Sequence, residues 1–437
     1  MAFSEQQQRW YEAACAQIDK DRLKQRTLEL TRIHSPTGAE AAASRYLVEE
    51  MERMGLDTEY QAISELSGNA VGRLGGSGDG ARMLLYAPVD THLEADAAQD
   101  VPWVGPELRD DMQTDAYTQG DLVIGLGASN PKCMVTTLME AVHAVREAGV
   151  PLKGEAVLAF AGGGMPQIVP ERNHFGLSSG VSQMLMRGVT ADFGIIFKPW
   201  WEIYHEHPGM CWFKVSVRGT LGYSGIPRGT PGFRSSIVPA AQLILALEEW
   251  LPQYTERNTR GQIAPEGWIA AVRSGWPEKP AFPSATTEIY LDLRSNPYQS
   301  TAEVQAEFDA AMREILVRHP EIEADWEMYA SVPGSRTPED HWVVRSATRG
   351  WEAQEGHQYP GAPMLAGQTD AAAINKLGIP LVRIGYPWIG DETVPEAFAE
   401  GLGGMGVCNI QGMLKPCRAL IYSIIDSLTR ERNELEL

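Results

Sequence analysis

Two short apolar runs near the middle of the chain constrain its fold more than any other feature. Residues 157–164 (VLAFAGGG) and 193–199 (FGIIFKP) are almost continuously apolar, which is typical of strands buried on both faces of a parallel sheet. The segments 135–149 and 178–188 repeat their apolar residues at helical spacing. Strands that alternate with helices in this way predict an α/β domain whose central sheet is mainly parallel.

The pattern changes after Met210, where apolar and polar residues begin to alternate. Residues 211–219 (CWFKVSVRG) and 285–295 (ATTEIYLDLRS) follow the two-residue period of half-exposed strands, and an amphipathic helical segment comes after each. Closer to the C-terminus the sequence returns to the α/β pattern. We therefore expect an α+β domain at 207–332, inserted into a main domain that comprises residues 1–206 and 333–437.

The charge balance excludes some partners without naming a substrate. The 437 residues include 37 Lys and Arg against 57 Asp and Glu, a formal net charge of −20, so binding to nucleic acid or to anionic membranes is not expected. Five cysteines form no C-x-x-C pair, which favours reduced thiols over a disulfide framework. We see no apolar leader and no run of the ~20 apolar residues that would span a bilayer, so we expect a soluble cytoplasmic protein.

Several short phrases occur in an order that matches a known family. They are LLYAPVD (84–90), GLGASNPKC (125–133), LAFAGGGM (158–165), ADFGIIFKP (191–199), GTLGYS (219–224), Asp292 with Arg294, and GQTD (367–370). Together, over about residues 23–428, they resemble the zinc-dependent metallopeptidase family of aminoacylases, acetylornithine deacetylases and succinyl-diaminopimelate desuccinylases. The resemblance implies a zinc-peptidase-like main domain, with the inserted α+β domain as a lid through which a homodimer forms.

The chain departs from this family at the positions that would bind metal. The family holds two zinc ions with a first His, a bridging Asp, a Glu-Glu pair, an acid before a proline and a distal His. Here those positions carry Pro88, Asn130, Gly162 to Gly164 and Lys198, and the segment 401–411 at the distal position contains no histidine. Zinc takes His, Cys, Asp or Glu ligands, so we predict that the two-zinc site is absent and that no cofactor is bound.

Lys198 is the most informative of these substitutions. Its positive charge would occupy the space of a metal, where it could bind a carboxylate, stabilise an oxyanion or act as a base or nucleophile. The alternative is an ordinary lysine at a strand end that pairs with Asp90. Asp90 keeps the family position that orients a metal-bound His, so we expect it to pair with Lys198, to serve as a carboxylate base or to cap a turn.

Three more residues complete the expected catalytic set. Asn130 could hydrogen-bond a substrate carbonyl or position a water. His174 supplies an acid or base beside the expected cleft, although a hydrogen-bonded loop histidine fits equally well. Tyr223 replaces a lid histidine that in the family reaches the substrate carbonyl across the dimer, and its phenol can donate to an oxyanion.

The expected substrate-binding set comes from loops around the same cleft. The glycine run offers backbone N–H groups as an anion nest, or else it forms a tight turn. Trp200 would wall a pocket or pack a domain junction. A relocated zinc or manganese site built from Asp90, His92, Glu94 and His174 is an alternative. The full substrate-binding set is Gly162, Gly163, Gly164, His92, Trp200, Thr369 and Asp370.

These residues favour a hydrolase-like enzyme that cleaves an amide or related C–N bond of a small carboxylate-bearing molecule without the two zinc ions. A metal-free lyase, decarboxylase or isomerase would use the same residues. A non-catalytic ligand-binding pseudoenzyme and a metallohydrolase with relocated ligands also stay open. Because glycines and a lysine replace acids, the local site is less acidic than the family's, and the sequence predicts an anionic substrate despite its acidic total.

Overall fold

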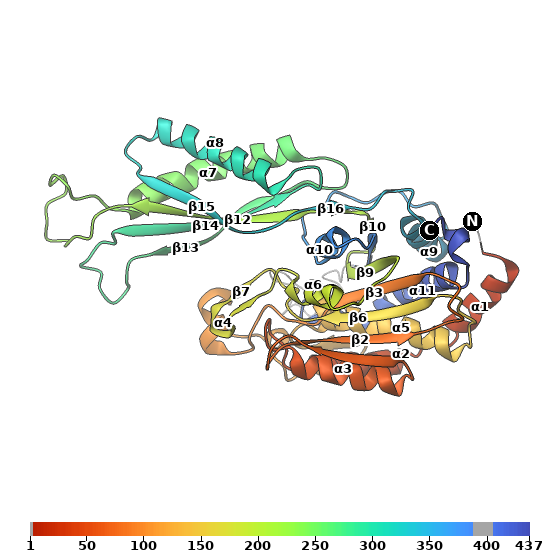
Figure 1. Ribbon diagram of the computed structural model, residues 1–437. Coiled ribbons are helices and arrows are strands. Elements are labelled where there is room, and N and C mark those ends of the chain that lie inside the picture. The colour runs from red at the N-terminus through yellow and green to blue at the C-terminus, as the bar shows by residue number, and fades with distance from the viewer. Residues whose placement is uncertain (1–2, 388–404) are drawn as a thin grey trace. The chain divides into compact units, whose positions relative to one another are not determined.

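The computed structural model describes residues 3–387 and 405–437, and its backbone contacts separate two compact units. The main unit comprises Met1–His205, Thr337–Ala362 and Ala373–Leu437, and the second unit comprises Glu206–Arg336 and Pro363–Ala372. Each unit has its own sheet and its own hydrophobic core (Figure 1).

A seven-stranded sheet forms the centre of the main unit. Its strand order is β1–β2–β6–β3–β9–β17–β10. The four inner strands β6, β3, β9 and β17 run parallel, while β1, β2 and β10 pair antiparallel, which confirms the prediction of a mainly parallel central sheet. The strands are β1 (Asp57–Ala62), β2 (Gly68–Leu74), β3 (Arg82–Pro88), β6 (Glu155–Ala161), β9 (Phe193–Pro199), β10 (Ile203–Tyr204) and β17 (Leu381–Tyr386).

The first two helices of the main unit begin at residues whose side chains cap them. Ser4 and Gln7 form a capping box at the start of α1, and the Asp19 side chain accepts two N–H groups of the first turn of α2, which satisfies donors that have no partner inside a helix. The helices are α1 (Glu5–Cys15), α2 (Lys20–Thr31), α3 (Ala41–Arg53), α4 (Ala97–Val104), α5 (Met134–Glu147), α6 (Ser179–Met186), α9 (Trp342–Glu355) and α11 (Ile410–Leu428). Among the described residues, no helix is long and apolar enough to cross a membrane.

Shorter elements complete the main unit. Helix α10 (Ala371–Lys376) runs from the end of the second unit into the main unit. Short helical turns lie at η1 (Asp110–Met112), η2 (Ala128–Cys133), η3 (Pro170–Arg172) and η5 (Arg432–Leu435). The short strands are β4 (Tyr117–Gln119), β5 (Leu122–Ile124) and β18 (Val407–Asn409) in one small sheet, and β7 (Ile168–Val169) and β8 (His174–Phe175) in another.

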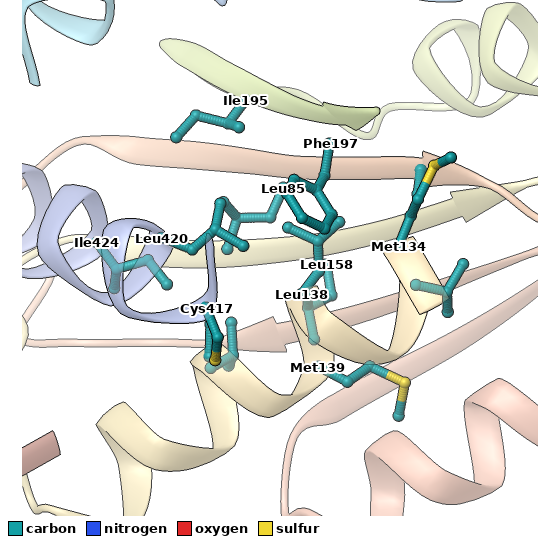
Figure 2. Packing of buried hydrophobic residues seen from close by; sticks show 14 of the residues in the cluster. Leu85, Met134, Leu138, Met139, Leu158, Ile195, Phe197, Cys417, Leu420 and Ile424 are labelled. Atoms are coloured by element: carbon teal, nitrogen blue, oxygen red, sulfur yellow. The ribbon is translucent and has the colours of Figure 1, made fainter. Parts of the chain in front are cut away.

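Helices α5 and α11 pack against each other and against β3 and β6. Figure 2 shows Leu138 of α5 and Leu420 of α11 close to Leu85 of β3 in this core. Intervening strand residues such as Tyr86 and Val157 point to the other face and are also fully buried. Burial of each such side chain contributes roughly 1.5–3 kcal/mol, and coverage of both faces explains why these strands are continuously apolar.

The second unit is a four-stranded antiparallel sheet packed against two helices, with the strand order β13–β14–β12–β15. Alternate residues of β14 are buried, and Phe213 packs against Phe308 with ring centroids 4.2 Å apart. Its elements are β12 (Gly209–Arg218), β13 (Gly267–Ser274), β14 (Thr286–Ser295), β15 (Ala324–Val332), α7 (Ile237–Asn258), α8 (Thr301–Arg318) and the paired short strands β11 (Glu206–His207) and β16 (Ser335–Arg336).

One segment corrects the expected domain boundaries. The sequence places residues 363–372 in the main domain, because the segment 363–387 returns to the α/β pattern. In the structure they belong to the second unit. The Leu365 N–H donates to the carbonyl of Gln262 at 2.9 Å, and the Leu365 carbonyl accepts from Ala264 at 3.2 Å, so backbone pairing within the second unit holds this segment.

Candidate functional site

The carboxyl ends of β6, β3 and β9 meet at one edge of the main sheet. The chain passes from β3 to its neighbour β6, and then crosses back past β3 to reach β9. Ligands of open α/β sheets bind where connections diverge in this way. Asp90 follows β3, Gly162–Gly164 follow β6, and Lys198 is the penultimate residue of β9, so three of the predicted site segments come from this edge.

Asp90 is completely buried and holds two loops together. One carboxylate oxygen accepts the N–H of Gly164 at 2.9 Å, and the other accepts the N–H of Met165 at 2.8 Å and the hydroxyl of Thr37 at 2.7 Å. Both oxygens are therefore engaged by the protein itself. This geometry corresponds to the predicted capping role and leaves Asp90 poorly placed to act as a proton acceptor for a substrate.

The glycine run binds the chain's own acceptors, which corrects its predicted role as an anion nest for substrate. The N–H of Gly162 donates to Asn69 Oδ1 at 3.1 Å, that of Gly163 to Glu40 Oε1 at 2.9 Å, and that of Gly164 to Asp90. All three donors are used inside the fold. The tight-turn alternative describes this segment, and Gly163 adopts φ +63° within it.

Side chains that fold over this turn explain why it consists of glycines. A Cβ atom on Gly162 would lie 2.7 Å from Glu40 Cδ, and one on Gly163 would lie 2.7 Å from His174 Nε2 and 2.6 Å from Ser179 Oγ. These separations are below normal van der Waals contact. The space beside the turn is therefore filled by a carboxylate and an imidazole that come from other loops.

Glu40 is a buried acid that the sequence analysis missed. Its Oε1 accepts the N–H groups of Gly38 at 2.7 Å and Gly163 at 2.9 Å, whereas its Oε2 has no partner within the described residues. Burial, with the nearby Asp90 carboxylate, raises the pKa of Glu40 to about 7. An acid directly before a helix gives no sequence signal of burial, because the residues that cover it are distant in the chain.

Lys132 is the basic side chain next to these two acids. Its ammonium is completely buried, donates to Ser35 Oγ, and lies 3.4 Å from the carbonyl of Ile33. Burial lowers the pKa of Lys132 to about 7, against the attraction of Asp90 and Glu40. The sequence assigns Lys132 only to a family phrase, and its fully desolvated position beside two carboxylates becomes visible in the fold.

Asn130 offers an unused acceptor in the turn before α5. Its side-chain Oδ1 is buried and has no hydrogen-bond partner among residues 3–387 and 405–437, while its backbone N–H donates to the carbonyl of Met405 at 3.3 Å. A buried polar atom without a partner costs about 1–3 kcal/mol. A bound ligand with an N–H or O–H group would remove that cost.

Two cations lie on the same face of adjacent strands. Lys198 is 8% exposed and is aligned with Gly385 of β17, and Arg383 lies two residues earlier on β17. The Arg383 guanidinium donates to the Pro199 carbonyl at 2.8 Å and takes part in no ion pair within the described part of the chain. Burial lowers the pKa of Arg383 to about 10, so it still carries a positive charge at neutral pH. Sequence analysis missed Arg383 because an arginine inside a strand is usually exposed.

His174 lies beside the glycine turn, next to Gly163. It is 8% exposed, and its Nε2 is 3.5 Å from Ser179 Oγ. Burial lowers the pKa of His174 although Asp90 opposes this shift, so the ring is neutral near pH 7 and can accept a proton. The structure thus brings His174, Asp90 and the glycine turn together.

His92, Glu94 and Trp200 have separate environments. The His92 ring meets the edge of Trp103 at 6.4 Å between centroids, and burial lowers the pKa of His92. Glu94 forms a two-point ion pair with Arg172, with a 2.8 Å distance from Nη1 to Oε1. Trp200 is 39% exposed at φ +73°, and the Arg383 guanidinium lies 5.3 Å from its ring centre.

The remaining predicted residues belong to the second unit. Tyr223 is exposed, and its ring lies 5.9 Å from that of Phe282. Thr369 and Asp370 are buried directly before α10, and Thr369 Oγ1 accepts the N–H of Ala371 at 3.3 Å.

The residues present do not fit the two zinc ions that the resemblance implies. Pro88 and the glycine turn have no side chain that could bind a metal, the oxygens of Asp90 are engaged, and a lysine, Lys198, stands where the family has an acid. Among the described residues, no three or more His, Cys, Asp or Glu side chains gather in a group that could hold a metal. Residues 401–404 of the segment expected at the distal position lie outside the described residues.

Comparison with solved structures reveals a shared fold. No protein-family model matches the chain. Human carnosine dipeptidase 1 is 13% identical, with 97% of this chain and 99% of that chain covered and a TM-score of 0.69. An M20 family metallo-carboxypeptidase from Sulfolobus solfataricus is 13% identical, with 91% of this chain and 97% of that chain covered and a TM-score of 0.64. An amidase of the hydantoinase/carbamoylase family from Burkholderia multivorans is 12% identical, with 95% of this chain and 99% of that chain covered and a TM-score of 0.62. The chain therefore has the mixed α/β fold of these structures.

Proposed function

We propose that this chain is a hydrolase that cleaves an amide or related C–N bond in a small carboxylate-bearing molecule, without the two zinc ions of the family it resembles. The observation that carries the proposal is the pair of buried cations, Lys198 and Arg383, at the carboxyl edge of a fold shared with a dipeptidase, a carboxypeptidase and an amidase. Fixed positive charge in a desolvated site can hold a carboxylate or a developing oxyanion, as a metal ion would.

The proposed division of labour follows from the environment of each side chain. Lys198 stabilises the oxyanion that forms when water attacks the scissile carbonyl, and Arg383 adds positive charge for the substrate carboxylate. Asn130 Oδ1 accepts a substrate N–H group. The neutral His174 takes a proton from the attacking water and returns it to the leaving nitrogen.

Asp90, Glu40 and Lys132 have a positioning role in this proposal. Their hydrogen bonds hold the turn after β6 and the loop before α3, which fixes the position of His174 next to Gly163. They make no contact with substrate in the proposed reaction.

A non-catalytic ligand-binding protein is the second candidate. The observation in its favour is that the N–H groups of the glycine turn and both carboxylate oxygens of Asp90 are engaged by hydrogen bonds inside the fold, which leaves fewer groups to take part in a reaction. A lyase, decarboxylase or isomerase that uses the same cations is a variant of the first proposal.

We also propose that the chain forms a homodimer through its second unit and works in the cytoplasm. The edge strand β13 supports the dimer proposal, because Trp268 is 68% exposed and Val272 is 49% exposed on a strand with one free edge. Sedimentation of the wild type and of a Trp268→Glu, Val272→Glu variant would test it, with a shift to monomer expected for the variant.

The experiment that tests the proposed function is amine release from dipeptides, N-acyl amino acids and N-carbamoyl amino acids, with the protein dialysed against a chelator. Hydrolysis of at least one class, undiminished by the chelator, is the expected result. Activity that disappears with the chelator and returns with zinc or manganese would instead support the relocated metal site. Binding of a panel member without any turnover would support the non-catalytic candidate.

A further inference from the structure

A hollow lies within the second unit, where the C-terminal end of α7 meets the turn between β14 and α8. Its volume is about 310 Å³, and its lining includes Arg257, Arg260, Tyr298, Gln299 and Glu303. Neither the proposed reaction nor the resemblance uses these residues, so their arrangement needs its own explanation.

Two guanidinium groups stack on one aromatic ring here. Arg260 lies 3.9 Å and Arg336 4.7 Å from the ring centre of Tyr298. A guanidinium that stacks on a ring keeps its in-plane N–H groups available for a carboxylate or phosphate. Neither arginine forms an ion pair with any carboxylate of the described residues.

The aromatic ring is held in place by a buried acid. Glu206 is 4% exposed; one oxygen accepts the hydroxyl of Tyr298 and the other accepts the N–H of Gln262 at 2.7 Å. Glu206 also faces Arg336 across the β11–β16 pair, which offsets part of that charge. Arg260 is therefore the least compensated cation of the hollow.

The other charged groups of the hollow are already engaged. Arg257 donates to Glu307 at 2.9 and 3.1 Å. Glu303 accepts the N–H and the hydroxyl of Ser300, both at 2.8 Å, as part of the capping box of α8. Their pairing leaves the charge of Arg260 for a ligand.

The lining of the hollow also contains a neutral hydrogen-bond acceptor, the side-chain oxygen of Gln299. Gln299 Nε2 donates to Asn258 Oδ1 at 3.0 Å and Glu307 Oε2 at 3.4 Å, which fixes the orientation of the amide. Its Oε1 is buried and has no partner within the described part of the chain. A ligand that carries both an anionic group and a hydrogen-bond donor would satisfy Arg260 and Gln299 together.

We propose that this hollow binds a small organic carboxylate that bears a hydroxyl or amine donor, with the carboxylate on Arg260 and the donor on Gln299. The site is independent of the chemistry proposed for the main unit. If the hollow does not bind a carboxylate, the proposed hydrolysis in the main unit is not affected, because it uses other residues.

The test is equilibrium binding of L-malate, succinate and inorganic phosphate to the full chain at probe concentrations up to about 10 mM. Malate and succinate differ by one hydroxyl, so malate is expected to bind more tightly by roughly 3–10-fold, the value of one hydrogen bond. Phosphate is expected to bind more weakly than malate.

Substitutions locate the binding. Arg260→Gln is expected to weaken malate binding by at least about tenfold, and Arg260→Lys, which keeps the charge but loses the planar fork, by an intermediate factor. Arg273→Gln is the matched control, since Arg273 lies 5.6 Å from the ring centre of Tyr290 and outside the hollow. Equal malate affinity in the wild type and Arg260→Gln, equal affinity for malate and succinate, or no binding of any probe would each overturn the proposal. Unchanged thermal unfolding of each variant shows that a loss of binding is local.

Discussion

The carboxylate of Asp90 accepts the backbone N–H of Gly164 at 2.9 Å, so the loop after β3 is tied directly to the turn after β6. This hydrogen bond lies at the edge of the sheet where the resemblance would place metal ligands. It indicates that an anionic side chain at this position now stabilises a loop, and that positive charge for a ligand has to come from elsewhere on the edge, namely from Lys198 and Arg383.

Replacing Asp90 with Asn should destabilise the fold by about 1–3 kcal/mol, because an amide has only one acceptor oxygen and its NH₂ group would face an N–H donor of Gly164 or Met165. Urea unfolding measures the loss. Asp96→Asn is the control, since Asp96 caps α4 by accepting the N–H of Ala98 at 2.7 Å and asparagine caps equally well. Similar losses in both variants would contradict the role given to Asp90.

Alanine substitutions at Gly163 and Gly149 distinguish the cost of backbone strain from the cost of poor packing. Both adopt φ +63°, but a Cβ on Gly163 would meet Ser179 and His174, whereas one on Gly149 would meet nothing within 4 Å. Gly149→Ala should therefore cost about 1 kcal/mol of unfolding free energy, the price of the left-handed backbone alone. Gly163→Ala should cost about 1–3 kcal/mol more, since neighbouring side chains must move. Equal costs in urea unfolding would show that the space beside Gly163 is open.

The buried Glu40 and Lys132 should give the unfolding free energy a minimum near pH 7. The pKa of Glu40 is raised from 4.5 to about 7, so its contribution to stability falls as the pH rises through that interval. The pKa of Lys132 is lowered from 10.5 to about 7, so its contribution rises as the pH increases from about 7 to 10.5. Each interval should change the unfolding free energy by on the order of 3–5 kcal/mol.

Variants separate these two effects in urea unfolding at a series of pH values. Glu40→Gln should abolish the decrease below pH 7, and Lys132→Met should abolish the increase above it. Glu249→Gln, at an exposed position of α7, should leave the curve unchanged. A curve for Glu40→Gln that runs parallel to that of the wild type between pH 4.5 and 7 would rule out a raised Glu40 pKa.

The sheet was predictable from the sequence because strands buried on both faces are continuously apolar, as VLAF and GIIF are. The position of Lys198 was predictable for the same reason, since it ends such a strand. The hydrogen-bond acceptors of the glycine turn were not predictable from the sequence. Asn69, Glu40 and Asp90 come from three separate segments, and only tertiary packing brings their acceptors to consecutive N–H groups.

Arg383 shows a second limit of sequence analysis. In LVRIGYP an arginine inside an apolar run resembles a residue at an exposed strand edge. Its burial follows from the position of β17 between β9 and β10, and its contacts with the Pro199 carbonyl and the rings of Trp200 and Tyr204 come from a segment about 180 residues earlier. Residue type and local pattern contain none of this information.

The central claim is that the charge of Lys198 does the work of a metal in C–N bond hydrolysis. Its most direct test is the hydrolysis rate of the best panel substrate, in chelator, for the wild type, Lys198→Met and Lys153→Met. Lys153 is a matched control that pairs with Glu431 at the surface at 3.1 Å. We predict that Lys198→Met lowers kcat/KM by on the order of 10²–10³-fold and that Lys153→Met leaves it unchanged. A Lys198→Met enzyme that is folded and as active as the wild type would contradict the claim.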